Sequence, residues 1–203
     1  MLQINTVAPD TLALLKKLQS IPELAETRLV GGTALALHLG HRLSIDLDLF
    51  GVFDSEIITG VLASESFDNF NIILDSKVIK HYFINKIKVD IVKYNNYQWL
   101  EDCIIENQIK IAGLKDIAAM KIAAITNRGS KKDFIDLFFL LKIFDIKEII
   151  ELYKTKYTDY SIFTAIYSLS YFNDAEKDEM PEMLIPTKWE NVKKKIANEV
   201  KQL

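Results

Sequence analysis

Two aspartates in the first quarter of the chain are separated by a single residue and could bind a metal ion together. Asp46 and Asp48 lie in the segment from Ser44 to Phe50, where polar and apolar residues alternate. This period of two is typical of a β-strand with one buried face, so both carboxylates are expected on the same face. Two like charges this close are unfavourable unless a cation joins them, and the spacing therefore predicts a metal site.

A third aspartate, Asp90, interrupts the apolar run from Ile87 to Tyr94. Strands disfavour aspartate, so this side chain either faces water or joins the first two carboxylates. Three carboxylates are what two-metal phosphoryl transfer requires, because Mg²⁺ prefers oxygen ligands and shares its shell with substrate phosphates.

A glycine turn precedes the paired aspartates. Gly31, Gly32 and Thr33 are predicted to link a short apolar strand to a helix that ends at Gly40. Such a turn presents backbone N–H groups and a helix N-terminus to phosphate. A plainer interpretation stays open, in which the glycines form only a turn and the aspartates only an exposed strand edge.

The rest of the chain divides by element type into a mixed α/β front, residues 1–110, and an all-helical rear, residues 111–203. Helices are predicted over 9–18, 54–63, 114–127, 131–143 and 160–171, and capping-box spacing predicts two more starting at Asp145 and Thr187. Strands over 71–74, 78–84 and 87–94 form a predicted antiparallel meander. The predicted fold class is α/β (α+β): a mixed, largely antiparallel sheet flanked by helices, followed by a C-terminal helical lobe.

Composition excludes several classes of protein. The 203 residues are 49% hydrophobic and 26% charged, which is ordinary for a globular protein, and the net charge of −3 argues against a generally basic nucleic-acid coat. Cys103 is the only cysteine, so no internal disulfide can form. No secretory signal and no apolar run long enough for a membrane span is visible, and we expect a cytoplasmic protein.

Four motifs in order resemble those of one family, and together they cover most of the chain. They are GGTALALHLGHRLSIDLDLF, the strand motif Val89-Asp90-Ile91, a helical motif with Met120, Lys121, Ala124, Arg128, Lys132, Asp133 and Asp136, and the closing stretches YFNDAEKDEMPEML and TKWENVKKKI. This order resembles the AbiEii/AbiGii nucleotidyltransferase toxin family, a branch of the DNA polymerase β-like nucleotidyltransferases.

The resemblance implies a nucleotidyltransferase fold and transfer of a nucleoside monophosphate from an NTP to an acceptor hydroxyl, with release of pyrophosphate. The implied site residues fall into three groups. The metal ligands for two Mg²⁺ ions are Asp46, Asp48 and Asp90; the triphosphate contacts are Gly31, Gly32 and Thr33; and the nucleotide-site residues are Lys121 and Asp133. The resemblance further implies a toxin of a toxin–antitoxin or abortive-infection system, a cognate antitoxin, and tRNA or another RNA as acceptor.

Further cations are candidates from their positions. Arg42, just before the metal strand, could reach a phosphate or pair with Asp48. On one continuous helix Lys121, Arg128, Lys132 and Asp136 would share a face, within an arc of about 80°. If Gly129 breaks that helix the shared face is lost, and Asp133 could then be a helix-capping partner of Ser130 instead of a catalytic residue.

Other interpretations remain open for three sets of residues. Five lysines between residues 77 and 93 are either a solvated strand face or a track for RNA phosphates; they are Lys77, Lys80, Lys86, Lys88 and Lys93. His38 is expected to pack within its helix, and His41 has no assigned role. At the level of function, the alternatives are a non-catalytic nucleotide- or partner-binding module and a two-metal phosphohydrolase or nuclease.

Overall fold

The computed structural model describes all residues, 1–203, and is built on a seven-stranded mixed sheet with the strand order β3-β4-β5-β2-β1-β7-β6. The strands are β1 (Thr27–Val30), β2 (Leu47–Gly51), β3 (Phe70–Asp75), β4 (Ile79–Ile84), β5 (Ile87–Lys93), β6 (Ile104–Glu106) and β7 (Ile109–Ile111). Only the pairs β1–β7 and β2–β5 are parallel, and the other four neighbouring pairs are antiparallel. The predicted mixed, largely antiparallel sheet is therefore confirmed.

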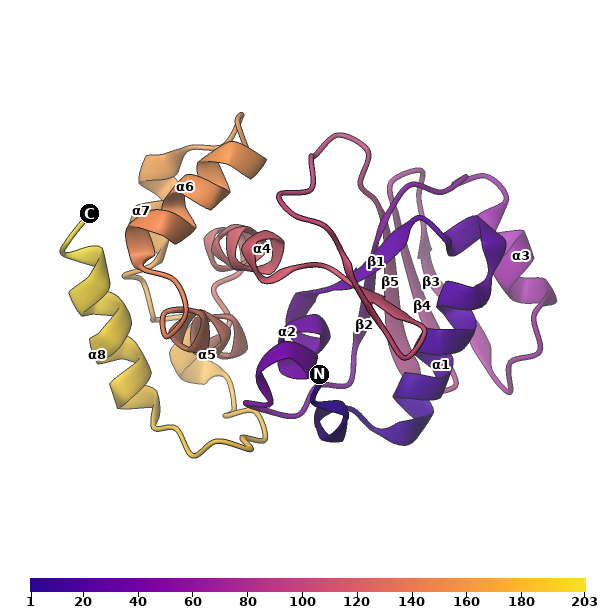
Figure 1. Cartoon of the computed structure of the whole chain (residues 1–203), viewed down its shortest axis with the longest axis horizontal. Helices are drawn as coiled ribbons and strands as arrows, with labels where there is room; N and C mark the ends of the chain where they lie inside the picture. The colour runs from indigo at the N-terminus through magenta and orange to yellow at the C-terminus, as the bar shows by residue number, and fades with distance from the viewer.

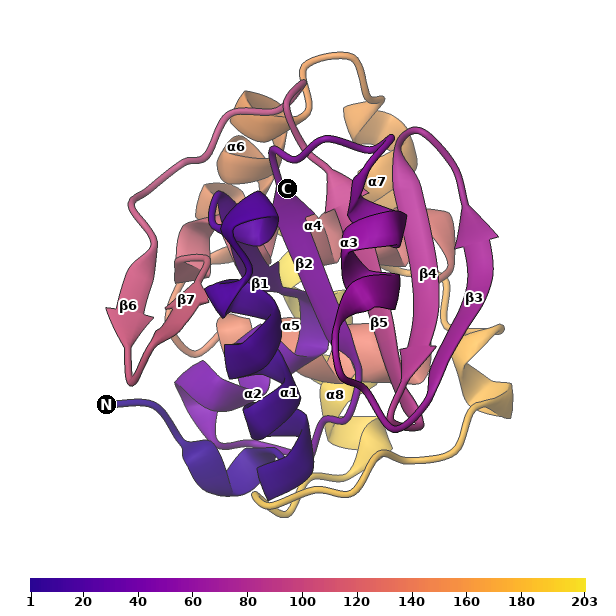
Figure 2. The ribbon, with the colours of Figure 1, turned by 90° about the vertical axis from the view of Figure 1, so that its right-hand side faces the viewer.

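Helices cover both faces of the sheet. They are α1 (Pro9–Ser20), α2 (Gly31–Leu39), α3 (Ile58–Ser64), α4 (Leu114–Asn127), α5 (Lys131–Leu140), α6 (Ile146–Lys156), α7 (Ile162–Ser168) and α8 (Trp189–Val200). Single 3-10 turns occur at Ile4–Thr6, Pro22–Leu24 and Ala175–Lys177. α1 and α3 lie on one face of the sheet, whereas α2 and the C-terminal helices lie on the other (Figures 1 and 2). None of these helices combines the length and the apolar character needed to cross a membrane.

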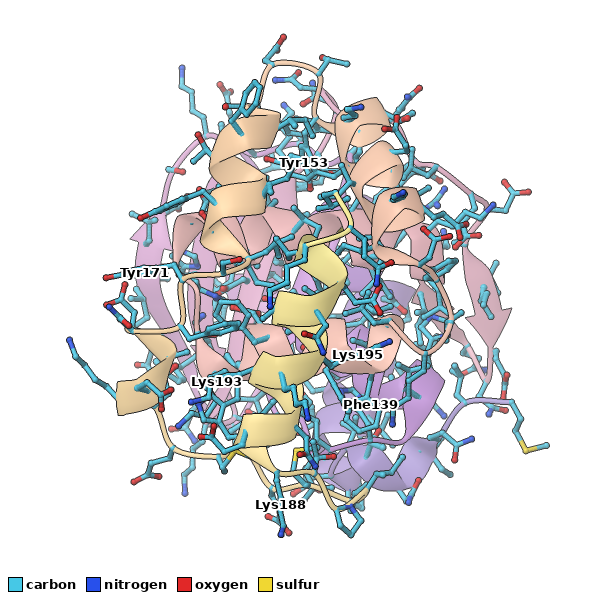
Figure 3. The ribbon with its side chains drawn as sticks, turned by 90° about the vertical axis from the view of Figure 1, so that its left-hand side faces the viewer. Phe139, Tyr153, Tyr171, Lys188, Lys193 and Lys195 are labelled. Carbon is cyan, nitrogen blue, oxygen red and sulfur yellow. The ribbon has the colours of Figure 1, made fainter.

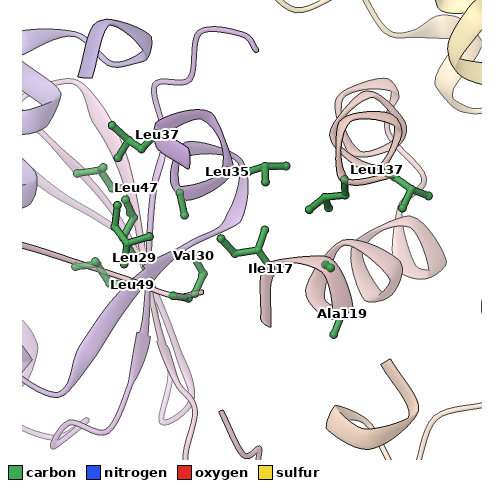
Figure 4. Packing of buried hydrophobic residues seen from close by; sticks show 14 of the residues in the cluster. Leu29, Val30, Leu35, Leu37, Leu47, Leu49, Ile117, Ala119 and Leu137 are labelled. Carbon is green, nitrogen blue, oxygen red and sulfur yellow. The ribbon is translucent and has the colours of Figure 1, made fainter. Parts of the chain in front are cut away.

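The apolar core is continuous from the sheet into the helical half of the molecule. Leu29 and Leu49 of the central strands are fully buried, as are Ile117 of α4 and Leu137 of α5. Figure 4 shows α2 between the central strands and α5, where its side chain Leu35 points toward α5. Since α2 starts at the glycine turn, the same packing that joins the two halves also fixes the turn.

The helical half ends with α8, which lies across its outer side (Figure 3). Val192 and Ile196 are the buried residues of α8 and face the core, whereas Lys194 is exposed. Lys193 pairs with Glu176 and Glu190, at 2.6 and 2.9 Å. The lysines of α8 thus lie on the side of the helix that faces away from the core.

Most predicted elements are present, with shifted ends. β2 begins at Leu47, so Asp46 lies one residue before the strand, and α2 begins at Gly31 rather than at Thr33. Asp145 caps α6 as predicted, accepting a hydrogen bond of 2.7 Å from Glu148 N. The predicted capping box at Thr187 is wrong, because this hydroxyl donates to Ile185 O at 2.9 Å and α8 starts at Trp189 without a side-chain cap.

The sequence analysis missed the hairpin of β6 and β7. β7 pairs with β1 through Leu29 and Ile111, so it extends the central sheet beyond the glycine-turn strand. Residue 110, the predicted boundary, falls inside β7, and the helical half begins with α4 at Leu114.

Candidate active site

Two of the predicted metal ligands are direct neighbours in the sheet. Asp48 of β2 is the register partner of Asp90 on the parallel strand β5, and Asp48 also pairs with Val30, the last residue of β1. Side chains of register partners project from the same face, so both carboxylates lie on the face that also carries α2. Asp46 lies two residues before Asp48, and the alternation of side chains along a strand places it on the same face.

The glycine turn is in direct contact with Asp48. Gly31 has a φ of +72°, and a Cβ placed on it would collide with Asp48 Oδ2. Burial, and next the neighbouring Asp90 carboxylate, raise the pKa of Asp48 to about 6. The sheet therefore places the poorly solvated Asp48 carboxylate beside that of Asp90. A bound cation would reduce the repulsion between these two charges.

Asp90 is held by neighbours on its own side of the sheet. His81 Nδ1 lies 2.8 Å from Asp90 Oδ1, and Lys88 Nζ donates to Asp90 Oδ2 at 2.8 Å. In this conformation no three carboxylate, histidine or cysteine side chains converge as a metal-ligand group. Asp90 is thus beside Asp48 in the register of the sheet, but both of its oxygens are turned to His81 and Lys88, and its role as a metal ligand stays a prediction.

The Thr33 side chain connects the first turn of α2 to the residues before β2. The side chain is buried, and its hydroxyl oxygen lies within hydrogen-bond distance of Asp46 O and, at 2.8 Å, of Ser44 Oγ. This hydroxyl is thus bonded within the protein, and the contact of the turn's backbone N–H groups with a triphosphate stays a prediction. Thr33 fixes the backbone of Asp46 against the first turn of α2.

Asp136 of α5 is the centre of a buried cluster of charges. It accepts hydrogen bonds from Arg42 Nε at 2.7 Å, Arg42 Nη2 at 2.9 Å and His41 Nε2 at 2.8 Å. Lys121 Nζ of α4 lies 2.6 Å from its second oxygen. Burial alone would raise the pKa of Asp136, but Lys121 and Arg42 hold it well below its ordinary value.

Asp133, one turn earlier on α5, carries the second half of this cluster. It lies 3.1 Å from Lys121 Nζ, and it accepts hydrogen bonds of 2.8 Å from Arg128 Nε and 2.6 Å from Ser130 Oγ. These contacts overcome the effect of burial and hold the pKa of Asp133 below its ordinary value. Asp133 is fully buried, and it therefore orients cations rather than facing solvent.

The helix does break at Gly129, so the predicted single helical face is wrong. α4 ends at Asn127 and α5 starts at Lys131, and Gly129 has a φ of +53°. The capping box of Ser130 and Asp133 does not form either, because Ser130 Oγ donates to the Asp133 side chain at 2.6 Å and accepts no backbone N–H. Asp178 Oδ2 accepts from the first N–H of α5, Lys131 N, at 2.8 Å.

The break nevertheless brings the motif residues together by another route. Arg128 folds back from the end of α4 to Asp133, and Lys132 Nζ of α5 lies 3.9 Å from Asp46 Oδ2. The side chains of Arg128 and Lys132 are 57% and 45% exposed, while that of Lys121 is 4% exposed. Arg128 and Lys132 are thus the motif cations that a ligand in solution can reach.

Arg42 links this cluster to the glycine turn and is held in place from the C-terminal half. A Cβ on Gly32 would collide with its Nη2 atom, so a side chain at that position would displace the guanidinium. The backbone around Arg42 is hydrogen-bonded to the segment that follows the 3-10 turn Ala175–Lys177. Leu43 N donates to Glu182 O at 2.8 Å, and Leu184 N donates to His41 O at 3.0 Å. Arg42 bonds Asp136 and not Asp48, so it is a link between the halves.

Three site residues were not in the predicted site. His41 is fully buried, with its Nε2–H directed at Asp136, and it had been left without a role. Asp136 was part of the helical motif but had no assigned chemistry. His81 had no signal in the sequence, because its proximity to Asp90 depends on the register of β4 and β5. His38 packs in α2 as expected, with Nε2 donating to Ala112 O at 2.9 Å.

The five lysines of the meander do not share a face. Lys80 is buried on the α3 side, where it donates to Ser55 O at 2.6 Å and pairs with Asp75. Lys93 has the same strand phase as the buried Val89 and Ile91, whereas Lys88 lies beside Asp90 on the opposite face. Neither a single solvated face nor a single track therefore describes the set.

The fold is that of nucleotidyltransferases. The structure aligns with JHP933 from Helicobacter pylori, with a TM-score of 0.59 and 17% identity over 97% of this chain and 92% of that chain. It also aligns with MenT4, the nucleotidyltransferase toxin Rv2826c from Mycobacterium tuberculosis H37Rv, with a TM-score of 0.54 and 15% identity over 94% of this chain and 81% of that one.

The sequence identifies the family within this class. The family profile described as "Nucleotidyl transferase AbiEii toxin, Type IV TA system" matches residues 13–202, and the chain belongs to this family. A protein of Aquifex aeolicus (strain VF5), described as uncharacterized, is 37% identical over 195 residues, which is 93% of each chain. The protein is accordingly a nucleotidyltransferase of the toxin type, and its family implies an NTP substrate and an antitoxin partner.

Proposed function

We propose that this protein moves a nucleoside monophosphate from an NTP to the hydroxyl of an RNA acceptor, with tRNA as the first candidate, and that it requires divalent metal. The observation that carries the proposal is the pairing of Asp48 with Asp90 on adjacent parallel strands, directly against the glycine turn. Asp46 completes the set of oxygen ligands that suits Mg²⁺.

The donor set fits a hard cation in its chemistry. Asp48 is poorly solvated and has a carboxylate neighbour, and both features raise its pKa and favour a bound cation in place of a proton. Asp46, Asp48 and, after release from His81 and Lys88, Asp90 would hold the ions. When bound, Mg²⁺ would activate the acceptor hydroxyl and neutralise the charge on the phosphates.

The protein's own cations have a separate task in this proposal. Arg128 and Lys132 are half exposed at the edge of the carboxylates and bind the triphosphate as it arrives. Lys121 and Asp133, buried behind them, hold Arg128 in position instead of contacting substrate. A preorganised cation of this kind stabilises charge on the transferred phosphate without further rearrangement.

An RNA acceptor is supported by the family resemblance and by charge. Lys88, 44% exposed, adds a third accessible cation to Arg128 and Lys132 around the three carboxylates. Cations around an acidic centre neutralise phosphates of the acceptor as well as those of the NTP. A protein acceptor is the competing possibility for the same chemistry.

The test is transfer of label. The purified protein is incubated with Mg²⁺ and each α-labelled NTP in turn, with and without total tRNA, beside the Asp46→Ala variant. We expect label on tRNA from one preferred NTP, and a loss of at least ~100-fold in the variant with its thermal unfolding unchanged. Label on protein would replace RNA by a polypeptide acceptor, and free labelled phosphate or cut RNA would indicate a hydrolase. An Asp46→Ala variant with full activity would overturn the metal-ligand assignment.

A further inference from the structure

The face of the sheet that carries the carboxylates continues outward past Asp90 to the edge strand β3. Sheet register places His81 beside Asp90, and Leu74 beside His81. One row further along, Phe83 lies between Lys88 of β5 and Asn71 of β3. The platform, defined here as Leu74, His81, Phe83 and Lys88, is thus continuous with the site.

The platform is open, although the residues of β4 that face the other way are buried. Tyr82 and Ile84 alternate with His81 and Phe83 along β4 and are fully buried on the α3 side, where Tyr82 Oη lies 2.7 Å from Thr59 Oγ1. By contrast, Phe83 is 41% and Leu74 43% exposed. An aromatic ring and a leucine left in solvent beside a reactive centre indicate a surface that contacts a ligand.

The charges around the platform favour a polyanion. Residues 70–93 contain five lysines but only two acids, Asp75 and Asp90. Asp75 pairs with Lys80 on the opposite face, and Asp90 is already neutralised by Lys88. Lys88 lies on this face, and Lys86 at the β4–β5 turn lines a surface hollow together with Phe83 and Asn71; both lysines are exposed. The platform therefore has a cationic border and no unpaired acid of its own strands.

Single-stranded RNA matches this combination of features. Its unpaired bases stack on aromatic and histidine rings, and its phosphates pair with lysine. His81 and Phe83 are two residues apart on β4, about 7 Å along the strand, and neighbouring strands are about 4.8 Å apart. A terminal nucleotide whose base lies over His81 or Phe83 would therefore have its hydroxyl within reach of Asp90 and Asp48.

We propose that the acceptor's terminal, single-stranded nucleotides lie on this platform, with Phe83 stacking a base and Lys86 and Lys88 contacting the backbone phosphates. This inference rests on the proposed RNA acceptor, and it assigns the contact to β4 and β5 rather than to the helical half. The ring of Phe83 supplies binding only, since Phe83 lies one row of the sheet beyond His81 and Asp90 and carries no group that can transfer a proton.

The test compares variants on the two faces of the same sheet edge. Phe83→Ala removes the ring, Phe83→Tyr keeps it, and Ile72→Ala is the matched control, because Ile72 is 51% exposed and pairs with Tyr82 on the opposite face. The first measurement is fluorescence anisotropy of a labelled single-stranded RNA with a free 3′-hydroxyl, which needs no turnover. The second is KM for tRNA and for NTP in the transfer assay.

We expect Phe83→Ala to weaken RNA binding and to raise KM for tRNA by about tenfold or more, with KM for NTP unchanged. Phe83→Tyr and Ile72→Ala should both behave like the unaltered protein. Equal RNA binding by Phe83→Ala would overturn the platform, and so would an equal loss in Ile72→Ala, which would show that the effect does not depend on the carboxylate face. If the unaltered protein transfers label to a polypeptide and binds no RNA, the platform is excluded while the transferase remains; if it transfers to nothing, the proposed function itself fails.

Discussion

Arg42 and Asp136 are separated by 94 residues in sequence and are joined by two hydrogen bonds of 2.7 and 2.9 Å. Arg42 precedes β2 and Asp136 lies on α5, so this buried pair connects the sheet to the helical half. Lys121 and His41 complete the shell around the same carboxylate. The glycine turn is packed against Arg42, and the charge cluster therefore determines where the turn lies relative to the helical cations.

Removal of the Asp136 carboxylate should destabilise the contact between the sheet and the helical half. We expect Asp136→Ala to lower the free energy of unfolding by about 3 to 5 kcal/mol, because Arg42 would be left as a buried charge without its partner. Urea denaturation followed by circular dichroism measures the change. As control, Lys154→Ala breaks the exposed pair with Glu151 and should change stability by less than about 1 kcal/mol. A similar small effect for Asp136→Ala would contradict the role given to the cluster.

The same cluster predicts a pH dependence. The pKa of Asp133 is lower in the folded protein than in the unfolded chain, so its ionised form contributes stability at pH values above the unfolded pKa of about 4. This contribution is lost progressively as the pH falls from there toward the folded pKa. The stability gap between the unaltered protein and Asp133→Asn should therefore be constant from about pH 7 to 5 and shrink below about pH 4. Urea unfolding over this range tests it, and a gap that stays constant in acid would count against the ion pairs.

Gly31 should be sensitive to the smallest side chain. Gly31→Ala places a Cβ against Asp48 Oδ2 on a residue with positive φ, and we expect a loss of about 1–3 kcal/mol together with reduced transfer. Gly60→Ala is the matched control: Gly60 lies in α3 with nothing within 4 Å of an added Cβ, and alanine there should stabilise by about 0.5–1 kcal/mol. Thermal unfolding and the label-transfer assay should separate the two variants, and equal effects would refute the close contact with Asp48.

Substitutions of Thr33 test whether its uncharged hydroxyl positions Asp46. Thr33→Val keeps the shape but removes the hydroxyl that donates to Asp46 O, which should cost about 1–3 kcal/mol and reduce transfer through a misplaced Asp46. Thr33→Ser keeps the donor and should retain most activity. If Thr33 contacted the triphosphate, Thr33→Val would instead raise KM for NTP with stability unchanged.

The sequence predicted the parts of the fold whose signal is local. Alternation identified β2 and the meander β3–β5, and helical propensity identified α4 and α5. The β6–β7 hairpin has strands of only three residues and turns through Asn107 and Gln108, both with positive φ but without a glycine, so neither length nor turn type indicated it. The boundaries at Asp46 and Gly31 were set by pairing and packing, which local patterns do not encode.

The site was predictable to the extent that its residues are close in sequence. Asp46 and Asp48 are two residues apart, and their shared face follows from strand geometry. The contacts of Asp90 with His81 depend on antiparallel register, and those of Asp136 with Arg42 depend on how α5 packs on α2. These are tertiary relationships, and the resemblance named the motif residues without showing that Asp133 and Lys121 face each other.

The connectivity of the sheet also has a consequence for synthesis on the ribosome. β2 pairs with β5, and β1 pairs with β7. The contacts of Arg42 are complete only when Asp136 on α5 and the segment near residue 183 have been synthesised. Contacts between segments this distant form late, because a long loop must close first. A nascent chain that has released only its N-terminal half thus carries all three site aspartates but lacks the charge cluster behind them. The site would therefore become complete only after α5 and the segment near residue 183 have been synthesised.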